Sequence, residues 1–330
     1  MQEIDFIQKL KESDLLGRGG AAFPTWQKWQ AVKQTRANKK YIICNGAEGE
    51  PGVFKDEFIL RKYPREVING IRIAMSYLGK SEAILFLNSK YYRKFRKKLS
   101  ELTKTLPITL FEKSHGYIAG EESALLNQIE GKRTEPRNKP PFPTESGLDG
   151  LPTLINNVET FYYISKIAKG EYKKTTFYSI SGEVKNRGVF ELPLALTIKE
   201  VLEKTKNYPK FSFFAQIGGW ACGEIFLANE LNKPFSGCAS IIIYDYKKTK
   251  LTKLLKDWAV FYSDGNCDKC APCREGTARL AELASQKQID FGAIDDILLA
   301  LEKTSFCSLG RGIVKPYRSL ILKLKLDGKN

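Results

Sequence analysis

The sequence predicts an α/β domain, then a small β-rich domain, then a helical bundle. In residues 1–172, short apolar runs alternate with amphipathic helical segments. Residues 173–250 show alternating strand patterns around a single helix, and residues 251–330 show only helical periodicity. Because each region has one dominant hydrophobic period, we expect three domains with these boundaries.

The first region alternates helices with strands. The expected helices cover residues 4–16, 25–33, 64–78, 91–106, 121–129 and 157–168. The expected strands cover residues 41–44, 83–87 and 108–111. Strands separated by helices of this length form a parallel sheet with helices on its faces.

The second region is dominated by short strands. They are expected at residues 177–183, 189–192, 213–217, 225–227 and 240–244, with one helix at residues 198–204. The last 80 residues contain no strand pattern. They are therefore expected to pack as a bundle of helices.

Composition excludes several classes of protein. Of the 330 residues, 42% are hydrophobic and 27% are charged, which is ordinary globular usage, and the longest apolar runs are too short to cross a bilayer. The N-terminal segment has no export signal, so we expect a cytoplasmic protein or one at the periphery of a membrane complex. The single histidine, His115, leaves little room for a Ser/His/Asp triad or for an imidazole zinc site.

The net charge of +16 permits two interpretations. The lysines are spread along the chain, with denser groups at residues 94–98 and 247–253, and no known nucleic-acid motif accompanies them. A solvated basic surface is the simpler interpretation. An anionic partner, such as an acidic protein or a dinucleotide, stays open, and nucleic acid is the least expected of these partners.

Four of the seven cysteines predict an iron–sulfur cluster. Cys267, Cys270 and Cys273 follow one another at intervals of three and can occupy three corners of a cubane, whereas structural zinc usually takes paired CxxC hooks. Cys307 lies near a predicted helix end, where a thiolate is favoured, and is the expected fourth ligand. Zinc and free redox-active thiols are the alternatives. The other cysteines are isolated and are expected to be small buried hydrophobic residues: Cys44, Cys222 and Cys238.

Residues 17–22, GRGGAA, form a glycine-rich loop. They satisfy the letters of a dinucleotide fingerprint, but a helix precedes them and a basic segment follows, so that fingerprint is not expected. The loop opens onto the helix expected at residues 25–33. Free backbone N–H groups and a helix N-terminus together favour a phosphate group.

An acidic loop, residues 45–52, follows the first strand at the edge where open α/β sheets bind ligands. It belongs to a set of segments that occur in a fixed order. They are GRGGAAFPTWQKW (17–29), CNGAEGEPGVFKDE (44–57), GYIAGEESALL (116–126), EGKRTEPRNKPPFP (130–143), NNVET (156–160), and CDKCAPCREGT (267–277) with SFCSLG (305–310). From about residue 5 to 320, the chain resembles the family of flavin-binding, NADH-oxidising subunits of NADH-quinone oxidoreductase (respiratory complex I), with relatives in NAD-linked hydrogenases and formate dehydrogenases.

The resemblance implies a Rossmann-like FMN-binding domain, a ubiquitin-like β-grasp (SLBB) domain and a helical domain holding a [4Fe–4S] cluster. It also implies an NADH dehydrogenase, in which FMN exchanges a hydride with NADH/NAD⁺ and single electrons pass through the cluster. A flavin suits this task because it handles both two-electron and one-electron steps.

The resemblance further implies roles for individual residues. The FMN phosphate and ribityl chain would be held by Gly17, Arg18, Gly19, Gly20 and Lys28. The flavin would be contacted by Asn45, Gly120, Asn156 and Asn157. The catalytic nicotinamide site would be lined by Glu48 and Glu50, together with Glu121 and Glu122. Stacking and charge contacts to NADH would come from Phe23, Lys139 and Phe142.

The chain departs from the family pattern at four positions. An acid is usual at Ala47, a glycine at Trp26, a stacking aromatic at Ala31 and a cysteine at Ala119. The departures at Trp26, Ala31 and Ala47 motivate an alternative function, an electron-relay or assembly module that does not oxidise NADH. We expect no fused thioredoxin-like [2Fe–2S] domain, and we therefore expect such a subunit and further redox subunits as partners.

Overall fold

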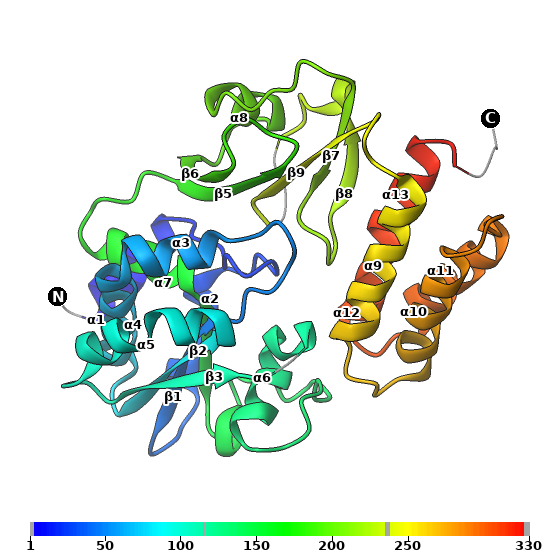
Figure 1. Cartoon of the computed structure of the whole chain (residues 1–330). Coiled ribbons are helices and arrows are strands. Elements are labelled where there is room, and N and C mark those ends of the chain that lie inside the picture. The colour runs from blue at the N-terminus through cyan, green and yellow to red at the C-terminus, as the bar shows by residue number, and fades with distance from the viewer. Residues whose placement is uncertain (1–2, 115, 235–237, 327–330) are drawn as a thin grey trace. The chain divides into compact units, whose positions relative to one another are not determined.

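The chain divides into two compact units in the computed structural model, which describes residues 3–114, 116–234 and 238–326 (Figure 1). The first unit comprises residues 1–49, 54–115 and 119–177. The second comprises residues 50–53, 116–118 and 178–330, and so includes two short segments from the first half of the sequence. Because the second unit contains both later predicted domains, the boundary at residue 250 stays a prediction.

The first unit is built on a four-stranded parallel sheet in the order β3-β2-β1-β4. Its strands are β1 (Lys40–Gly46), β2 (Ser81–Asn88), β3 (Ile108–Lys113) and β4 (Thr153–Asn157). The parallel α/β prediction is therefore confirmed. The sequence pattern did not predict β4, which pairs with β1.

Helices cover both faces of this sheet. They are α1 (Glu3–Glu12), α2 (Thr25–Gln34), α3 (Lys55–Lys62), α4 (Pro64–Leu78), α5 (Ser89–Thr103), α6 (Glu122–Ile129) and α7 (Val158–Ala168). On one face, Leu125 and Leu126 of α6 pack with Ile43 and Phe86 of the strands. On the other face, α4 and α7 cross so closely that a Cβ on Gly70 would overlap the carbonyl oxygen of Phe161.

The second unit begins with a five-stranded mixed sheet in the order β6-β5-β9-β7-β8. Its strands are β5 (Thr175–Gly182), β6 (Gly188–Pro193), β7 (Phe213–Ile217), β8 (Glu224–Leu227) and β9 (Ser240–Asp245). The first and last strands, β5 and β9, pair in parallel at the centre, and α8 (Ile198–Lys204) packs on one face through Val201 and Leu202. This arrangement is the predicted β-grasp fold.

The remaining helices of the second unit are α9 (Leu251–Gly265), α10 (Ala271–Leu283), α11 (Phe291–Thr304), α12 (Ser308–Gly312) and α13 (Val314–Lys323). Trp258, Tyr262 and Tyr317 are fully buried among them. The edge strand β8 is covered by α13, whose Ser319 hydroxyl accepts a hydrogen bond from the Ile225 amide at 3.0 Å. No helix in the described ranges is both long and apolar enough to cross a membrane.

Candidate functional site

The site of the first unit is at the carboxyl edge of its sheet, between β1 and β4. The chain leaves β1 towards β2 and β3 on one side and later returns to β4 on the other side. Ligands of open α/β sheets bind where the strand order reverses in this way. Asn45 and Asn157 are directly opposite each other in the β1–β4 register, at the ends of the two strands.

The predicted flavin residues meet at this edge. The Asn45 side chain donates to the Gly120 carbonyl at 2.9 Å, and the Asn157 side chain donates to the Asn45 carbonyl at 3.2 Å. The side-chain oxygen of buried Asn156 accepts from the indole N–H of Trp29 at 3.0 Å. A Cβ on Gly120 would lie 3.5 Å from that of Ala47. The sheet thus brings the four predicted positions together, although Asn156 is already held by Trp29.

The glycine-rich loop lies against the junction of β4 and α7. The Arg18 amide donates to the Thr160 hydroxyl at 3.0 Å, and a Cβ on Gly19 would be 3.4 Å from that of Asn157. Gly20 has a φ of +106°, and no atom lies within 4 Å of where its Cβ would be. The loop backbone therefore borders open space beside the predicted flavin residues.

The Arg18 guanidinium contributes an unused donor. Its Nη2 donates to the Tyr172 hydroxyl at 3.2 Å, and the group lies over the Tyr163 ring at 5.7 Å. Its Nε is buried and has no hydrogen-bond partner within the described structure. A buried cationic N–H without a partner is costly, and an anionic ligand would satisfy it. This orphaned donor and the open backbone at Gly20 fit an FMN phosphate.

Four predicted residues form one ion-pair network. The Lys28 ammonium lies 3.2 Å from Glu122, and the Lys139 ammonium lies 2.8 Å from Glu121 and 3.2 Å from Glu122. Burial opposes ionisation of Glu122, but the charges of Lys28 and Lys139 outweigh it, so the pKa of Glu122 is lowered. Glu121 also caps α6 by accepting from the Ser123 and Ala124 amides, each at 2.9 Å.

The two predicted carboxylates of the acidic loop have different surroundings. Glu48 caps α3, where its carboxylate accepts from the Asp56 amide at 3.2 Å, and it also accepts from the Tyr91 hydroxyl at 2.7 Å. Burial and the nearby Asp56 carboxylate raise the pKa of Glu48. Glu50 belongs to the second unit, where it accepts from the Tyr117 hydroxyl at 2.5 Å.

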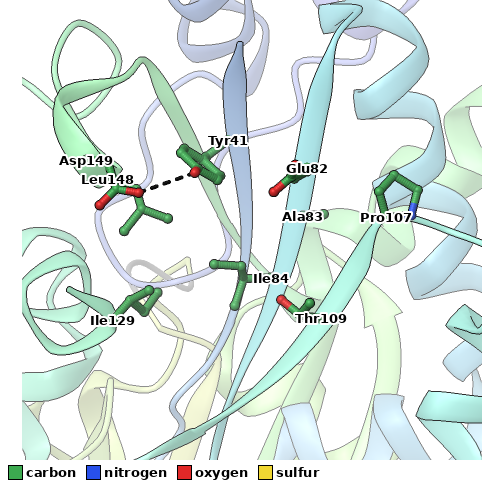
Figure 2. Close-up of a pocket in the computed structure, with 9 residues that line it drawn as sticks. All are labelled: Tyr41, Glu82, Ala83, Ile84, Pro107, Thr109, Ile129, Leu148 and Asp149. Atoms are coloured by element: carbon green, nitrogen blue, oxygen red, sulfur yellow. Dashed lines mark hydrogen bonds between the residues drawn. The ribbon is translucent and has the colours of Figure 1, made fainter. Parts of the chain in front are cut away.

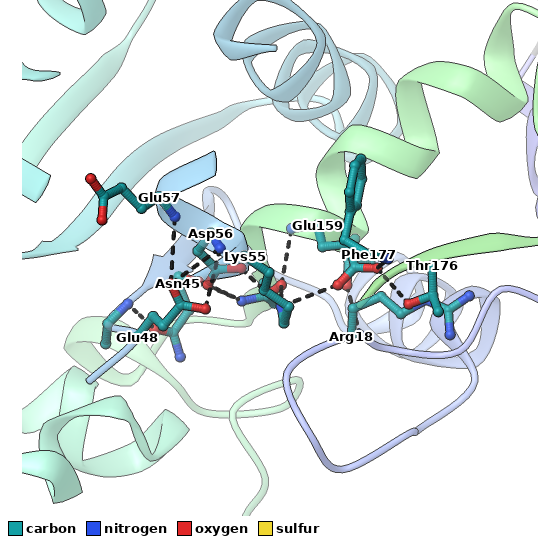
Figure 3. A network of polar contacts seen from close by, with 12 residues as sticks. Arg18, Asn45, Glu48, Lys55, Asp56, Glu57, Glu159, Thr176 and Phe177 are labelled. Carbon is teal, nitrogen blue, oxygen red and sulfur yellow. Dashed lines mark hydrogen bonds and ion pairs between the residues drawn. The ribbon is translucent and has the colours of Figure 1, made fainter. Parts of the chain in front are cut away.

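A buried charge group contacts the Asn157 side chain, and Figure 3 shows its members Lys55, Asp56 and Glu159. The Lys55 ammonium is 2.8 Å from Asp56, 3.1 Å from Glu159 and 3.2 Å from the Asn157 side-chain oxygen. Glu159 also accepts from the Thr176 hydroxyl at 2.8 Å. Sequence reasoning quoted these residues within motifs but did not identify them as parts of the site. Their signal was ionisable side chains next to apolar ones, since Lys55 follows Phe54 and Glu159 follows Val158.

The predicted aromatic contacts are at the surface. Phe23 and Phe142 are 47% and 50% exposed, so both rings are accessible for stacking. Trp26, where the family has glycine, lies under the Lys11 ammonium, which is 5.2 Å from the ring centre. His115 lies outside the described residues.

The second unit brings the four predicted cluster ligands together. Cys270 is the N-cap of α10 and Cys307 the N-cap of α12, while Cys273 is buried in the first turn of α10. Burial, together with nearby Cys270, Cys307 and Cys267, raises the pKa of the Cys273 thiol to about 12. Iron bound here would replace the thiol protons and so remove the penalty that burial places on the thiolate.

Two further observations fit a cluster at this place. A Cβ on Gly310 would overlap the Ser305 hydroxyl and lie 3.3 Å from that of Cys273, so glycine keeps this space clear. The Ser305 hydroxyl is buried without a partner in the described structure. No three Cys, His or acidic side chains of the described ranges converge on a single ion site. A cubane does not require this, because each thiolate binds a different iron.

Two of the three other cysteines differ from expectation. Cys44 is buried as predicted, but Cys222 is exposed and Cys238 is partly exposed. The prediction of burial was therefore wrong for these two. Cys222 lies in the turn between β7 and β8, where no strand holds it in the core.

A cavity of about 300 Å³ lies at the opposite, amino end of the first sheet. It is lined by residues near the starts of three strands, including Tyr41, Glu82 and Thr109 (Figure 2). The Tyr41 hydroxyl donates to Asp149 at 3.3 Å across its rim. None of the predicted site residues lines this cavity, so it is not the site described above.

Both the sheet region of the first unit and the cysteine region of the second match known protein families. Residues 10–166 match the family model of the Nuo51 FMN-binding domain, and residues 253–327 match that of the NADH-ubiquinone oxidoreductase-F iron-sulfur binding region. The F subunit of NADH-quinone oxidoreductase from Streptomyces coelicolor is 32% identical over 96% of this chain and 80% of its own length. The F subunit from Aquifex aeolicus is 33% identical over 93% of this chain and 80% of its own.

The same architecture occurs in a solved structure. A crystal structure of an NAD⁺-reducing [NiFe]-hydrogenase in the H₂-reduced state aligns with a TM-score of 0.89 and 27% identity. The alignment covers 98% of this chain. This chain spans only 61% of that hydrogenase chain.

Proposed function

This chain belongs to the family of the NADH-quinone oxidoreductase F subunits, and we propose that the carboxyl edge of its first sheet holds FMN and NADH while its four grouped cysteines hold a [4Fe–4S] cluster. It is an NADH dehydrogenase subunit in which electrons enter as hydride and leave singly. When bound, FMN supplies the step between two-electron and one-electron chemistry. The named relatives are NADH-quinone oxidoreductase subunits and give the relay-only alternative no support.

The chain's own residues would bind and orient the two nucleotides. The Gly17–Gly20 backbone and the Arg18 Nε would donate to the FMN phosphate, with Lys28 adding positive charge. The amides of Asn45 and Asn157 would fix the flavin at the strand ends. The unpartnered Arg18 Nε and the open space beside Gly20 support this assignment most directly.

NADH would bind on the side of the ion-pair network. The exposed rings of Phe23 and Phe142 are available for stacking, and Lys139 supplies charge for an anionic nucleotide. Glu48, Glu121 and Glu122 of the first unit would line the nicotinamide end. Hydride transfer needs no protein acid or base at the reacting carbon, so these side chains serve to position the nicotinamide and to exclude water.

Electrons would leave through partner subunits. We propose a thioredoxin-like [2Fe–2S] subunit and further redox subunits as partners within a larger complex, at the cytoplasmic side. The description of the relatives as subunits supports the larger complex.

The phosphate assignment is tested with a matched pair of glycine variants. Gly20 and Gly131 both have positive φ, and at both no atom lies within 4 Å of the Cβ position. Gly20→Ala should weaken FMN binding at least tenfold, because its methyl group would hold the phosphate away from the backbone. Gly131→Ala also adds a methyl group at a positive φ, of +70°, but outside the site, and should leave affinity unchanged. Titration of the flavin-free chain with FMN, followed by fluorescence quenching, measures both, and equal affinities would contradict the assignment.

A further inference from the structure

The outer face of α5 is strongly basic. The helix contains six cations, Lys90, Arg93, Lys94, Arg96, Lys97 and Lys98, and one acid, Glu101. Its fifteen residues therefore contribute +5 of the chain's net +16. All six cations are exposed, and the side chains of Lys90 and Arg93 are 74% and 79% exposed. We call these six residues the α5 basic face.

This charge arrangement does not stabilise the helix. Lys90 and Lys94, Arg93 and Lys97, and Lys94 and Lys98 are like-charged pairs four residues apart, and each such pair costs a few tenths of a kcal/mol. Cations in the first turn, such as Lys90, also oppose the helix dipole, and no acid is present there. Residues that break a local rule without a structural gain point to a functional surface.

Helix stability comes from the opposite face. Tyr91, Phe95, Leu99 and Thr103 recur every four residues and are all buried. Asn88 caps the helix by accepting from the Tyr91 amide at 2.9 Å. The helix is therefore anchored without help from its cations.

Neighbouring acids neutralise only part of the α5 basic face. Glu57 of α3 lies 2.6 Å from Lys94 and 3.7 Å from Lys90, and Glu112 lies 3.5 Å from Arg93. Two more exposed cations of α3, Arg61 and Lys62, extend the surface, because the Lys98 ammonium donates to the Arg61 carbonyl at 3.4 Å. The result is a surplus of positive charge on two adjacent helices.

The α5 basic face begins beside the acidic loop, residues 45–52. The Asn88 side chain donates to the Glu48 carbonyl, and the Tyr91 hydroxyl donates to the Glu48 carboxylate at 2.7 Å. Glu48 also caps α3. The N-terminal ends of both basic helices are thus bonded to Glu48, the second residue after β1.

We propose that the α5 basic face docks an acidic protein subunit of the same complex. Charge complementarity selects a polyanionic surface. None of the described large apolar side chains that are exposed belongs to α3 or α5, so the face offers nothing to insert into a lipid bilayer. Of its aromatic residues, Tyr91 and Phe95 are buried and Tyr92 is only partly exposed, so the face lacks a row of open rings for stacking on bases, which disfavours single-stranded nucleic acid. The proposal rests on the proposed function only in taking the partner to be a subunit of that complex.

Lysine footprinting of the native complex tests this proposal. The complex, purified through a tag on this chain, and the isolated chain are each acetylated and analysed by mass spectrometry. Lys90, Lys94, Lys97 and Lys98 should react at least fivefold less in the complex. The exposed control lysines, Lys206 and Lys210 of the second unit, should react equally in both samples. Equal reactivity on α5 would overturn the proposal.

Cross-linking and charge reversal identify the occupant. A zero-length carbodiimide should join the α5 lysines to Asp or Glu of another polypeptide. The double variant Lys97→Glu/Lys98→Glu should retain about tenfold less of that polypeptide at physiological salt, whereas Lys206→Glu/Lys210→Glu should retain it fully. Protection that disappears on nuclease or detergent treatment would assign the face to nucleic acid or lipid and overturn the proposal.

Reduction of the flavin by NADH distinguishes a failure of the docking proposal from a failure of the proposed function. Isolated Lys97→Glu/Lys98→Glu should fold with an unchanged thermal midpoint, and NADH should bleach its flavin at the wild-type rate. A wild-type chain whose flavin NADH does not bleach would refute the proposed function, while the footprint would still report on docking.

Discussion

At the residue scale, the least expected feature is the buried charge group that contacts Asn157. Lys55, Asp56 and Glu159 are each at most 4% exposed, and one ammonium lies between two carboxylates. Such a group rarely adds stability relative to an apolar core, but removing one partner leaves uncompensated charge. Its contribution here is to fix the Asn157 side chain, which both Lys55 and Asp56 contact.

Lys55→Met should therefore be strongly destabilising. It leaves two buried carboxylates without their cation, which typically costs about 3–5 kcal/mol. Urea unfolding of the variant measures the loss. The matched control is Lys174→Met, which breaks an ion pair with Asp14 whose side chains are 61% and 76% exposed and should cost well under about 1 kcal/mol. Similar losses in the two variants would contradict the charge-group interpretation.

Glu48 should make stability depend on pH. Its pKa is raised in the folded chain, so between the ordinary glutamate value of 4.5 and the raised value the folded state binds a proton that the unfolded state does not. The free energy of unfolding therefore falls as pH rises through this window, by up to about 1.4 kcal/mol per pH unit. Glu48→Gln keeps an acceptor for the α3 amides and should remove this slope.

Urea midpoints between about pH 5 and 7.5 compare the two proteins. This range lies below the titration of Lys113, whose pKa burial lowers to about 8. Curves for wild type and Glu48→Gln that stay parallel over the range would show that Glu48 is not the titrating group.

At the element scale, helices with strong end signals could be predicted closely. The predicted helix at residues 64–78 coincides with α4, because Pro64 starts it and Gly79, with a φ of +83°, ends it. The predicted segments 198–204 and 213–217 also coincide with α8 and β7. Local sequence contains enough information at such ends.

The two missed elements of the first unit depend on distant contacts. The start of α3 is capped by Glu48, which lies eight residues before Asp56. β4 has only five residues and ends in two asparagines, so its strand character comes from pairing with β1. Because β4 was not predicted, the sequence could not place Asn157 beside Asn45, and the site could be predicted as a set of residues but not as a geometry.

The crossing of α4 and α7 should not tolerate a larger residue at Gly70. A methyl group there would overlap the Phe161 carbonyl, and overpacking of this kind costs about 1–3 kcal/mol. Gly292→Ala is the control, since Gly292 is an exposed residue of α11 and alanine there should be neutral or gain up to about 1 kcal/mol of helix propensity. Thermal unfolding of both variants measures the difference, and a neutral Gly70→Ala would refute the close crossing.

A pair of cysteine variants tests which residues of the second unit bind the cluster. Cys270→Ala should abolish normal cluster incorporation and destabilise the C-terminal helices, because three thiolates cannot complete the ligand set. Cys222→Ala, at an exposed cysteine outside the set, should keep full iron content. Iron per chain and thermal stability of the anaerobically purified variants measure both effects. Unchanged iron in Cys270→Ala would remove this residue from the ligand set.

At the scale of the whole molecule, the fold separates two tasks. The first unit provides the parallel sheet whose carboxyl edge suits nucleotides, and the second provides the β-grasp sheet and the four cysteines. The net charge of +16 is unevenly distributed along the chain, since α5 alone accounts for +5 of it. A chain that receives electrons as hydride and releases them singly requires partner proteins, and the α5 basic face is the proposed place for one of them.

Anaerobic rapid mixing of the FMN- and cluster-loaded chain with NADH tests the central claim most directly. Absorbance follows the flavin, and electron paramagnetic resonance of frozen samples follows the cluster. The account predicts that NADH bleaches the flavin first and that the signal of the reduced cluster follows. In Cys270→Ala, NADH should bleach the flavin but no cluster signal should appear. A flavin that stays oxidised in NADH, or a cluster that is reduced while the flavin stays oxidised, would contradict it.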